Sequence, residues 1–346
     1  MRLSLVILTT WCCCLPACST LGYLAQATYG HLDLLSRAQP IEWVLHENAP
    51  PKLTRLLLLV PSIRAFGNRH GLTISENYQT YAELDREAAV WVVTACAPLS
   101  FEPKIWEFPI VGSFPYLGWF DKREALHFAD GLAREGWDVH VRGASAYSTL
   151  GWFRDPILST MLTRGASVTG DFVNTILHES VHATVYVDGQ GYFNESIALF
   201  VADRMTPQYL RETHGAGSPE LGAYVAEETR RQGDEQLMLG AYAQLDTVYA
   251  SDRDNLAKLA RKYAILEKLE IDLELDDDKN INNATLEGFR VYRVGQETLA
   301  DLLQHCGHDW GRFLDAVSSV SPEDFSTEQQ EDLEPVLSPL LARTCD

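Results

Sequence analysis

The sequence predicts an α+β fold in which a small mixed β-sheet precedes a mainly helical half. Two observations support it. Between residues 88 and 149, runs rich in valine and tryptophan alternate with Gly and Pro, which is typical of short strands. From residue 171 onward, apolar residues recur at helical spacing over most of the chain. With 346 residues, of which 46% are hydrophobic, the chain can bury a full core.

The first 17 residues have the features of an export signal. Arg2 and the free amine come first, an apolar run extends to Leu15, and the small residue Ala17 precedes Cys18. This run is shorter than the roughly 20 residues needed to cross a bilayer. We therefore expect residues 1–17 to be a signal peptide that is removed.

The tetrad that ends at Cys18 resembles the lipobox of bacterial lipoproteins, in which the signal is cut before the cysteine and the cysteine is lipidated. Acyl chains then anchor the protein by hydrocarbon burial, at about 0.8 kcal/mol per methylene. Ser19, rather than Asp, resembles outer-membrane sorting. We expect a protein anchored by lipid in the bacterial cell envelope, at the outer membrane and facing the periplasm. The alternative is an ordinary cleaved signal with Cys18 free.

The net charge limits the classes of binding partner, and the positions of the cysteines indicate which thiols are able to form a disulfide. Forty-eight acidic residues against 28 basic ones give a net charge of −20, which repels phosphate backbones, so we expect no nucleic acid partner. Cys96, Cys306 and Cys345 remain beside Cys18 in an oxidising compartment. Cys306 and Cys345 both lie in the C-terminal region and are able to pair, whereas the apolar run around Cys96 indicates a buried thiol.

The expected elements follow in chain order. Helical periodicity covers residues 21–38 and 52–66. Strand patterns cover residues 89–95, 108–120 and 137–142. A helix over residues 121–135 separates the last two, with Asp121 as its N-cap and Gly136 at its end. Later helical patterns cover residues 171–187, 224–245, 254–269 and 298–317.

No repeat, low-complexity linker or strong boundary divides the chain. We expect a single domain over residues 18–346. Its N-terminal helical and sheet lobe covers about 21–165, and its catalytic helical lobe covers about 166–346.

His178 and His182 are the strongest functional signal. They lie four residues apart in a helical pattern over residues 171–187 that contains no Gly or Pro. On a helix, this spacing places both imidazoles on one face about one turn apart, which suits two ligands of one metal. A buried helix must satisfy both rings, and a metal does so. The alternative is a surface helix whose histidines face solvent.

Glu179 follows the first histidine directly, so its carboxylate points away from that ligand direction and can reach a water in an open coordination position. The pattern H-E-x-x-H is typical of zinc hydrolases, so we expect Zn²⁺ as the cofactor. Zinc lowers the pKa of a bound water to about 7, and Glu179 is the expected general base.

Two carboxylates compete for the third ligand position. Glu195 lies in a second predicted helix that Asn194 is expected to cap, and the glycines of the preceding turn permit a tight connection from His182. Asp188 is the alternative, because it stands six residues after His182, where the longer H-E-x-x-H-x-x-G-x-x-H pattern has a ligand. That pattern needs Gly where this chain has Val185, so we favour Glu195.

Asp203 lies eight residues after Glu195 and near the same helix face. We expect its carboxylate to orient one of the histidines, as residues behind metal ligands often do. An exposed helix carboxylate is the alternative.

Several stretches resemble the bacterial family of exported proteins described as "Putative aminopeptidase". They are residues 146–156, residues 177–183 with 193–196, and residues 282–286 with Tyr292. The resemblance covers nearly the whole mature chain. It implies a zincin-like fold of the gluzincin type, a zinc site at His178, His182 and Glu195 with Glu179 as base, and aminopeptidase activity.

Two of these stretches have further expected roles. Residues 143–150 have the composition of an edge strand, and zincins bind an extended peptide by adding it to such an edge; a purely structural strand is the alternative. Its expected substrate-binding residues are Ala146, Tyr147, Ser148 and Thr149.

Tyr292 is expected to donate a hydrogen bond from its phenol to the tetrahedral oxyanion, although most of the 14 tyrosines must be structural.

The sequence thus predicts a zinc-dependent peptidase with peptide substrates and a membrane attachment through its N-terminal lipid. The alternative is a non-catalytic, zinc-containing envelope lipoprotein with a structural or binding role. Glu179 favours the enzyme, because a structural site has a closed fourth position and no use for a free carboxylate beside it. An aminopeptidase also needs a carboxylate for the free amine of its substrate. The G-x-M-E-N pattern that supplies it in large gluzincin aminopeptidases is absent, so endopeptidase and amidase action stay open.

Overall fold

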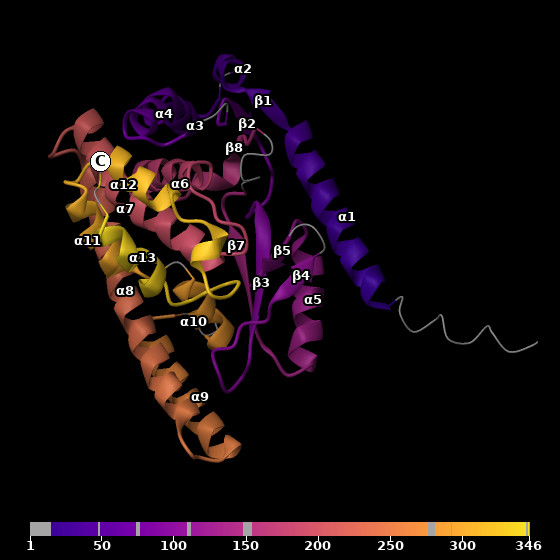
Figure 1. Cartoon of the computed structure of the whole chain (residues 1–346). Helices are drawn as coiled ribbons and strands as arrows, with labels where there is room; N and C mark the ends of the chain where they lie inside the picture. Colours follow the sequence, from indigo (N-terminus) through magenta and orange to yellow (C-terminus); the bar gives the residue numbers. More distant parts are fainter. Residues whose placement is uncertain are drawn as a thin grey trace, which may run out of the picture.

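A computed structural model describes residues 15–47, 49–73, 77–108, 112–147, 154–275, 281–291, 293–343 and 345. It has an α+β architecture in which short strands lie between the first helix, α1 (Leu15–Ser36), and a larger group of C-terminal helices, whereas α4 (Val60–Arg69) packs on α6 (Val168–His182) (Figure 1). The N-terminal elements are α1 (Leu15–Ser36), β1 (Ala38–Pro40), α2 (Ile41–His46), α3 (Pro51–Leu57) and α4 (Val60–Arg69).

The single helix expected over residues 52–66 is divided into α3 and α4. Pro61 lacks an N–H and its ring clashes with the carbonyl four residues earlier, at Leu57, where α3 ends. Leu56, Leu57 and Ile63 on these two helices are buried in the main core.

The strands form separate small sheets rather than the one mixed sheet that we expected. They are β2 (Thr80–Ala82), β3 (Val90–Cys96), β4 (Trp106–Phe108), β5 (Gly112–Phe114), β6 (Leu117–Trp119), β7 (Asp138–Ala144) and β8 (Ile157–Leu158). Within the described residues, the first sheet has the order β1-β2-β8 and is mixed, and the second has the order β6-β3-β7 and is antiparallel. We call the second one the central sheet. Strands β4 and β5 form a two-stranded ribbon.

Helices cover both faces of the central sheet. Helix α5 (Lys122–Arg134) begins at Asp121, whose Oδ1 accepts hydrogen bonds from the N–H groups of Arg123 and Glu124, as the N-cap prediction requires. Its apolar side packs on the face of β3 that carries Val93 and Ala95. Thr94 points to the other face, where its Oγ1 contacts the Ala284 carbonyl oxygen of α10 (Asn283–Arg290) at 3.4 Å.

The C-terminal half is helical. It comprises the 3₁₀ turn η1 (Ser159–Met161), α6 (Val168–His182), α7 (Gly191–His214), α8 (Pro219–Ala250), α9 (Asn255–Asp272), α11 (Gln296–His305), α12 (Trp310–Ser318), the 3₁₀ turn η2 (Pro322–Asp324) and α13 (Glu334–Leu341). Helices α8 and α9 form a long arm that extends away from the rest (Figure 1). The helix expected over residues 298–317 is interrupted at Gly307, whose φ of 68° ends α11 in the left-handed region.

Cysteine pairing follows the sequence prediction. Cys306 and Cys345 are joined by a disulfide that ties the chain end to α11. Cys96 is a free, buried thiol on β3.

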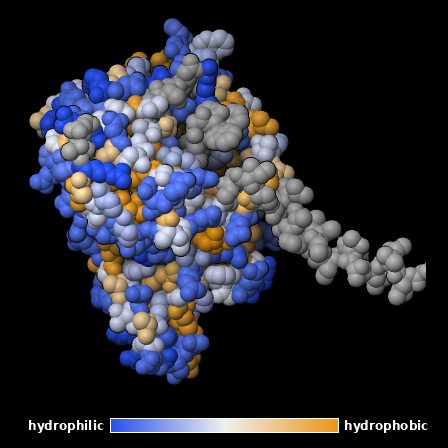
Figure 2. Space-filling model, in the orientation of Figure 1, coloured by the Kyte–Doolittle hydropathy of each residue, from blue (hydrophilic) through white to orange (hydrophobic). Residues whose placement is uncertain are grey.

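The surface in Figure 2 is mostly hydrophilic, in keeping with the net charge of −20. Exposed apolar side chains on α9 include Leu256, Tyr263 and Ile271. Within the described part of the chain, no helix is both long and apolar enough to span a bilayer.

Candidate metal centre

Helices α6 and α7 form an antiparallel pair at the middle of the main core. Phe172, Ile176, Phe193 and Phe200 on these helices are completely buried. Full burial of such a side chain contributes about 1.5–3 kcal/mol to folding. The pair therefore offers a rigid frame for the polar side chains that it carries.

The connection between the two helices differs from the sequence prediction. Helix α6 ends at His182, not at Val187, and α7 begins at Gly191, three residues before Asn194. Asn194 is therefore not an N-cap. Its Oδ1 accepts from the Val187 N–H and its Nδ2 donates to the Val187 carbonyl oxygen, both at 2.8 Å. The amide satisfies the backbone of a buried turn, and this turn brings the first part of α7 back to the end of α6.

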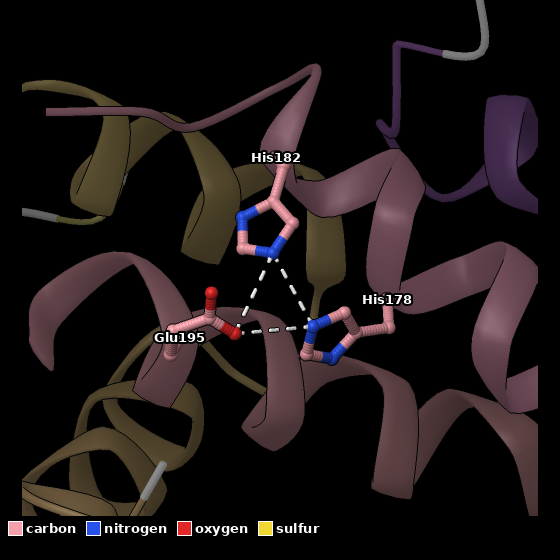
Figure 3. Close-up of side chains that lie close together, drawn as sticks. All are labelled: His178, His182 and Glu195. Carbon is pink, nitrogen blue, oxygen red and sulfur yellow. Dashed lines mark hydrogen bonds and ion pairs between the residues drawn. The ribbon is translucent and has the colours of Figure 1, made fainter. Parts of the chain in front are cut away.

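Three side chains converge in this frame (Figure 3). The two imidazole Nε2 atoms of His178 and His182 lie 3.2 Å apart. Glu195 Oε2 lies 3.4 Å from Nε2 of His178 and 3.7 Å from Nε2 of His182. Within the described residues, these three side chains form a group that is able to hold a metal ion, and we call them the metal group.

The separations fit a zinc-sized ion. Two ligand atoms at about 2.0–2.1 Å from zinc, at a tetrahedral angle to each other, lie about 3.3 Å apart. The three measured separations, 3.2 to 3.7 Å, are close to this value. Two imidazoles and one carboxylate also match the donor types that zinc prefers. The residues present therefore fit such an ion, and an open fourth position would remain.

Burial and neighbouring charges set the protonation of the same three side chains. Burial lowers the pKa of His182 to about 4, so this ring is neutral at pH 7. Burial acts against the charge of Glu195, but His182, His178 and Arg142 outweigh it and lower the pKa of this carboxyl. Burial also opposes protonation of His178, but the hydrogen bond and charge of Glu195 raise its pKa. A metal replaces the proton that this ring would otherwise take up.

Glu179 lies beside this group without belonging to it. Burial is the main cause that raises the pKa of its carboxyl to about 7, with His178 acting in the opposite direction and Glu195 and Asp155 adding to the rise. A carboxyl with such a pKa both accepts and releases a proton near neutral pH.

The other two carboxylates that we considered lie elsewhere. Asp188 is exposed after the end of α6 and is not part of the metal-binding group. Asp203 accepts a hydrogen bond from Asn174 at 3.0 Å and pairs with Arg293 at 3.8 Å. Its charge still acts on His178, whose pKa it helps to raise. Asp203 thus ties α7 to α6 one turn behind the metal group.

The edge strand that we expected over residues 143–150 ends earlier in the structure. Strand β7 ends at Ala144, so Ala146 and Tyr147 follow it, and the Tyr147 ring packs against Phe120 and His31. The chain turns there because Tyr147 is drawn into aromatic packing beside α1. Ser148, Thr149 and Tyr292 lie outside the described residues.

Three residues around the metal group were not singled out from the sequence. Asp155 is buried, and its charge acts on Glu179. Tyr78 is also buried; its N–H donates to the Asp155 carbonyl oxygen at 2.8 Å, and Glu179 contributes to its raised pKa. Arg142 on β7 acts on Glu195. Of these, Asp155 lies in a stretch that carries the family resemblance, and this was the available signal.

Comparison with known proteins gives a family for the chain. No curated protein and no solved structure matches it. A family model described as "Putative aminopeptidase" matches residues 22–333, which extend from within α1 to the residue before α13 and include the whole metal group. The chain therefore belongs to the "Putative aminopeptidase" family.

Proposed function

We propose that this protein is a zinc-dependent peptidase with His178, His182 and Glu195 as ligands and Glu179 as general base. The convergence of two imidazole nitrogens and a carboxylate oxygen at separations suited to one ion carries the proposal. Family membership supports peptidase activity. The zincin-like class and the gluzincin type belong to the same proposal.

Zinc in this site would supply Lewis acidity and make a water molecule more acidic. Glu179 takes the proton from the attacking water and returns it to the leaving amine, and its pKa of about 7 suits both transfers. Glu195 stays ionised and acts as a ligand, since its pKa is lowered. Two adjacent carboxylates thus take separate roles because their surroundings move their pKa values in opposite directions.

The substrate backbone has a candidate support in β7. This strand lies at the edge of the central sheet, next to β3 only, and it carries Arg142, whose charge acts on Glu195. A peptide that adds to this edge would run beside the metal group. We therefore propose residues 138–144 as the substrate strand, earlier than the residues that the sequence indicated.

The test compares the wild-type protein with Glu179→Gln, both purified with zinc. Bound zinc is measured by mass spectrometry, and cleavage of a mixed peptide library is followed by liquid chromatography. We expect equal zinc content and a loss of activity of roughly 10³-fold or more in the variant. Stoichiometric zinc with no cleavage by either protein would instead favour a non-catalytic zinc lipoprotein. Absence of bound zinc would contradict both functions.

We also propose that lipidated Cys18 anchors the protein in the bacterial outer membrane. The sequence around Cys18 supports this proposal. Metabolic labelling with a fatty acid, followed by membrane fractionation, should detect lipid on the wild type and none on Cys18→Ser. A wild-type protein without label would contradict it.

A further inference from the structure

A small cavity lies between the central sheet, α7 and α10. Its volume is about 20 Å³. The residues that line it include Thr94, Arg142, Tyr192, Glu287, Gly288 and Val291. A space of this size accepts one water molecule or a group of the same size, such as an ammonium. It is too small for a side chain.

Glu287 is the acidic group in this lining. It is 4% exposed, and its Oε1 accepts a hydrogen bond from the Tyr192 hydroxyl at 2.5 Å. Its Oε2 is buried and has no hydrogen-bond donor within the described chain. Burying a carboxylate oxygen without a donor is costly, so such an oxygen is a candidate for binding a ligand.

Arg290 reaches this carboxylate only at long range. Arg290 Nη1 lies 3.9 Å from Glu287 Oε2 but only 2.7 Å from Oε2 of Glu331, and it also donates to the Tyr242 hydroxyl. The guanidinium is thus oriented toward other acceptors. Oε2 of Glu287 therefore has no hydrogen-bond donor among the described residues, and an ammonium would supply both a donor and a positive charge.

The cavity adjoins the metal centre through two residues. Tyr192 precedes Glu195 by three positions on α7, so the two side chains are neighbours on the helix surface. Arg142 lines the cavity and also acts on Glu195. The cavity and the metal centre therefore have Arg142 and one side of α7 in common.

We propose that Glu287 binds the protonated N-terminal amine of the peptide substrate, with the ammonium group in this cavity. The inference rests on the proposed peptidase function and deepens it: the enzyme would act at free N-termini rather than at internal bonds. A water molecule is the competing occupant.

Binding of two small amides to the zinc-loaded, full-length protein tests the inference without turnover. Leucinamide has the amine, whereas 4-methylpentanamide has the same side chain and amide without it. By calorimetry, we expect leucinamide to bind roughly 10- to 100-fold more tightly to the wild type, the range of a hydrogen-bonded charge pair. Equal binding of the two amides, or no binding of leucinamide, would overturn the inference.

Variants of the cavity test whether it causes the preference for leucinamide over 4-methylpentanamide. Glu287→Gln should reduce the preference to within about 3-fold, whereas Glu297→Gln, which changes an exposed carboxylate on α11 outside the cavity lining, should retain it. Gly288→Ala is a second variant for the case that Glu287→Gln does not fold. Its new Cβ would meet Thr94 at an ordinary 3.8 Å, and it should lower the preference by filling the space. A preference that survives both Glu287→Gln and Gly288→Ala would exclude this cavity.

Failure of this inference differs from failure of the proposed function. If the wild type cleaves peptides but binds both amides equally, the protein is a peptidase that does not recognise the amine through Glu287. If it binds leucinamide selectively but cleaves nothing, the amine site stands and the catalytic proposal fails.

Discussion

The metal group and the cavity beside Glu287 are built in different ways. The residues of the metal group lie between His178 and Glu195, on two consecutive helices joined by one short turn. The cavity combines residues of β3, β7, α7 and α10, from Thr94 to Val291. The first site depends on one helix pair, and the second depends on how α10 docks on the central sheet. A ligand set can therefore be read from a short sequence segment, whereas a specificity pocket cannot.

Two asparagines hold α10 in its place. Asn282 Nδ2 donates to the Val139 carbonyl oxygen at 2.8 Å. Asn283 Nδ2 donates to the carbonyl oxygens of Ala97 and Ser100, and its Oδ1 accepts from Tyr249. Both asparagines lie in a stretch that carries the family resemblance. They position the wall of the cavity rather than take part in chemistry.

The largest expected effect is on the metal group. Glu195→Ala removes one of three ligands and should lower zinc affinity at least about 100-fold, with loss of any peptidase activity. Affinity is measured by competition with a chelator of known strength. Asp188→Asn is the matched control and should bind zinc as the wild type does. Weaker zinc binding in Asp188→Asn than in Glu195→Ala would reverse the ligand assignment.

Where α10 docks on the central sheet, Asn283→Ala removes an amide that is completely buried. Several backbone and side-chain partners lose their hydrogen bonds, so the free energy of unfolding should fall by about 3 kcal/mol. Denaturant unfolding measures this change. Zinc affinity should stay within about 3-fold of the wild type if the two regions are independent. A large parallel loss of zinc would instead show that α10 also supports the metal group.

His140, on β7 of the central sheet, makes the stability of the protein sensitive to acid. Burial, with a contribution from Arg142, lowers its pKa from 6.5 to about 4. Between these values the unfolded chain takes up a proton that the native state does not, so stability falls as the pH drops from 6.5 to 4. The integrated effect is at most about 3 kcal/mol. His140→Gln should flatten this part of the pH dependence in urea unfolding, whereas Gln at the exposed His127 should not. Identical curves for wild type and His140→Gln would contradict the assignment.

The smallest effect concerns packing of the helix pair against α8. A Cβ added at Gly170 of α6 would lie 2.4 Å from a ring carbon of Tyr224, so Gly170→Ala should cost about 1–2 kcal/mol. Gly131 on α5 has no atom within 4 Å of its added Cβ. Gly131→Ala should therefore stabilise by about 0.5–1 kcal/mol through helix propensity. Thermal unfolding compares the two, and a stabilised Gly170→Ala would contradict the close contact.

Sequence reasoning succeeded where a single local rule decides the structure. The Asp121 cap and the left-handed Gly136 bound α5 as expected. It failed where a local signal competes with packing. Asn194 has the composition of a helix cap but serves a buried turn, and the strand expected to continue through Tyr147 stops because that ring packs against Phe120.

The choice between the two possible third ligands shows the same limit. Asp188 and Glu195 were both acceptable by spacing, and the balance between them rested on one residue, Val185. The structure brings Glu195 to the histidines because α6 ends at His182 and α7 begins early, at Gly191. A shift of a few residues in a helix end rotates every later side chain, since each residue turns the helix by about 100°.

By itself, the sequence determined the chemistry of the centre: two imidazoles one helical turn apart with a carboxylate between them, since a period of 3.6 residues suffices to place them. Only the tertiary structure decided which later carboxylate joins these rings, and that Glu287 lies buried beside Tyr192, 95 positions away. Contacts of that kind arise from the packing of whole helices on a sheet, which no local pattern encodes.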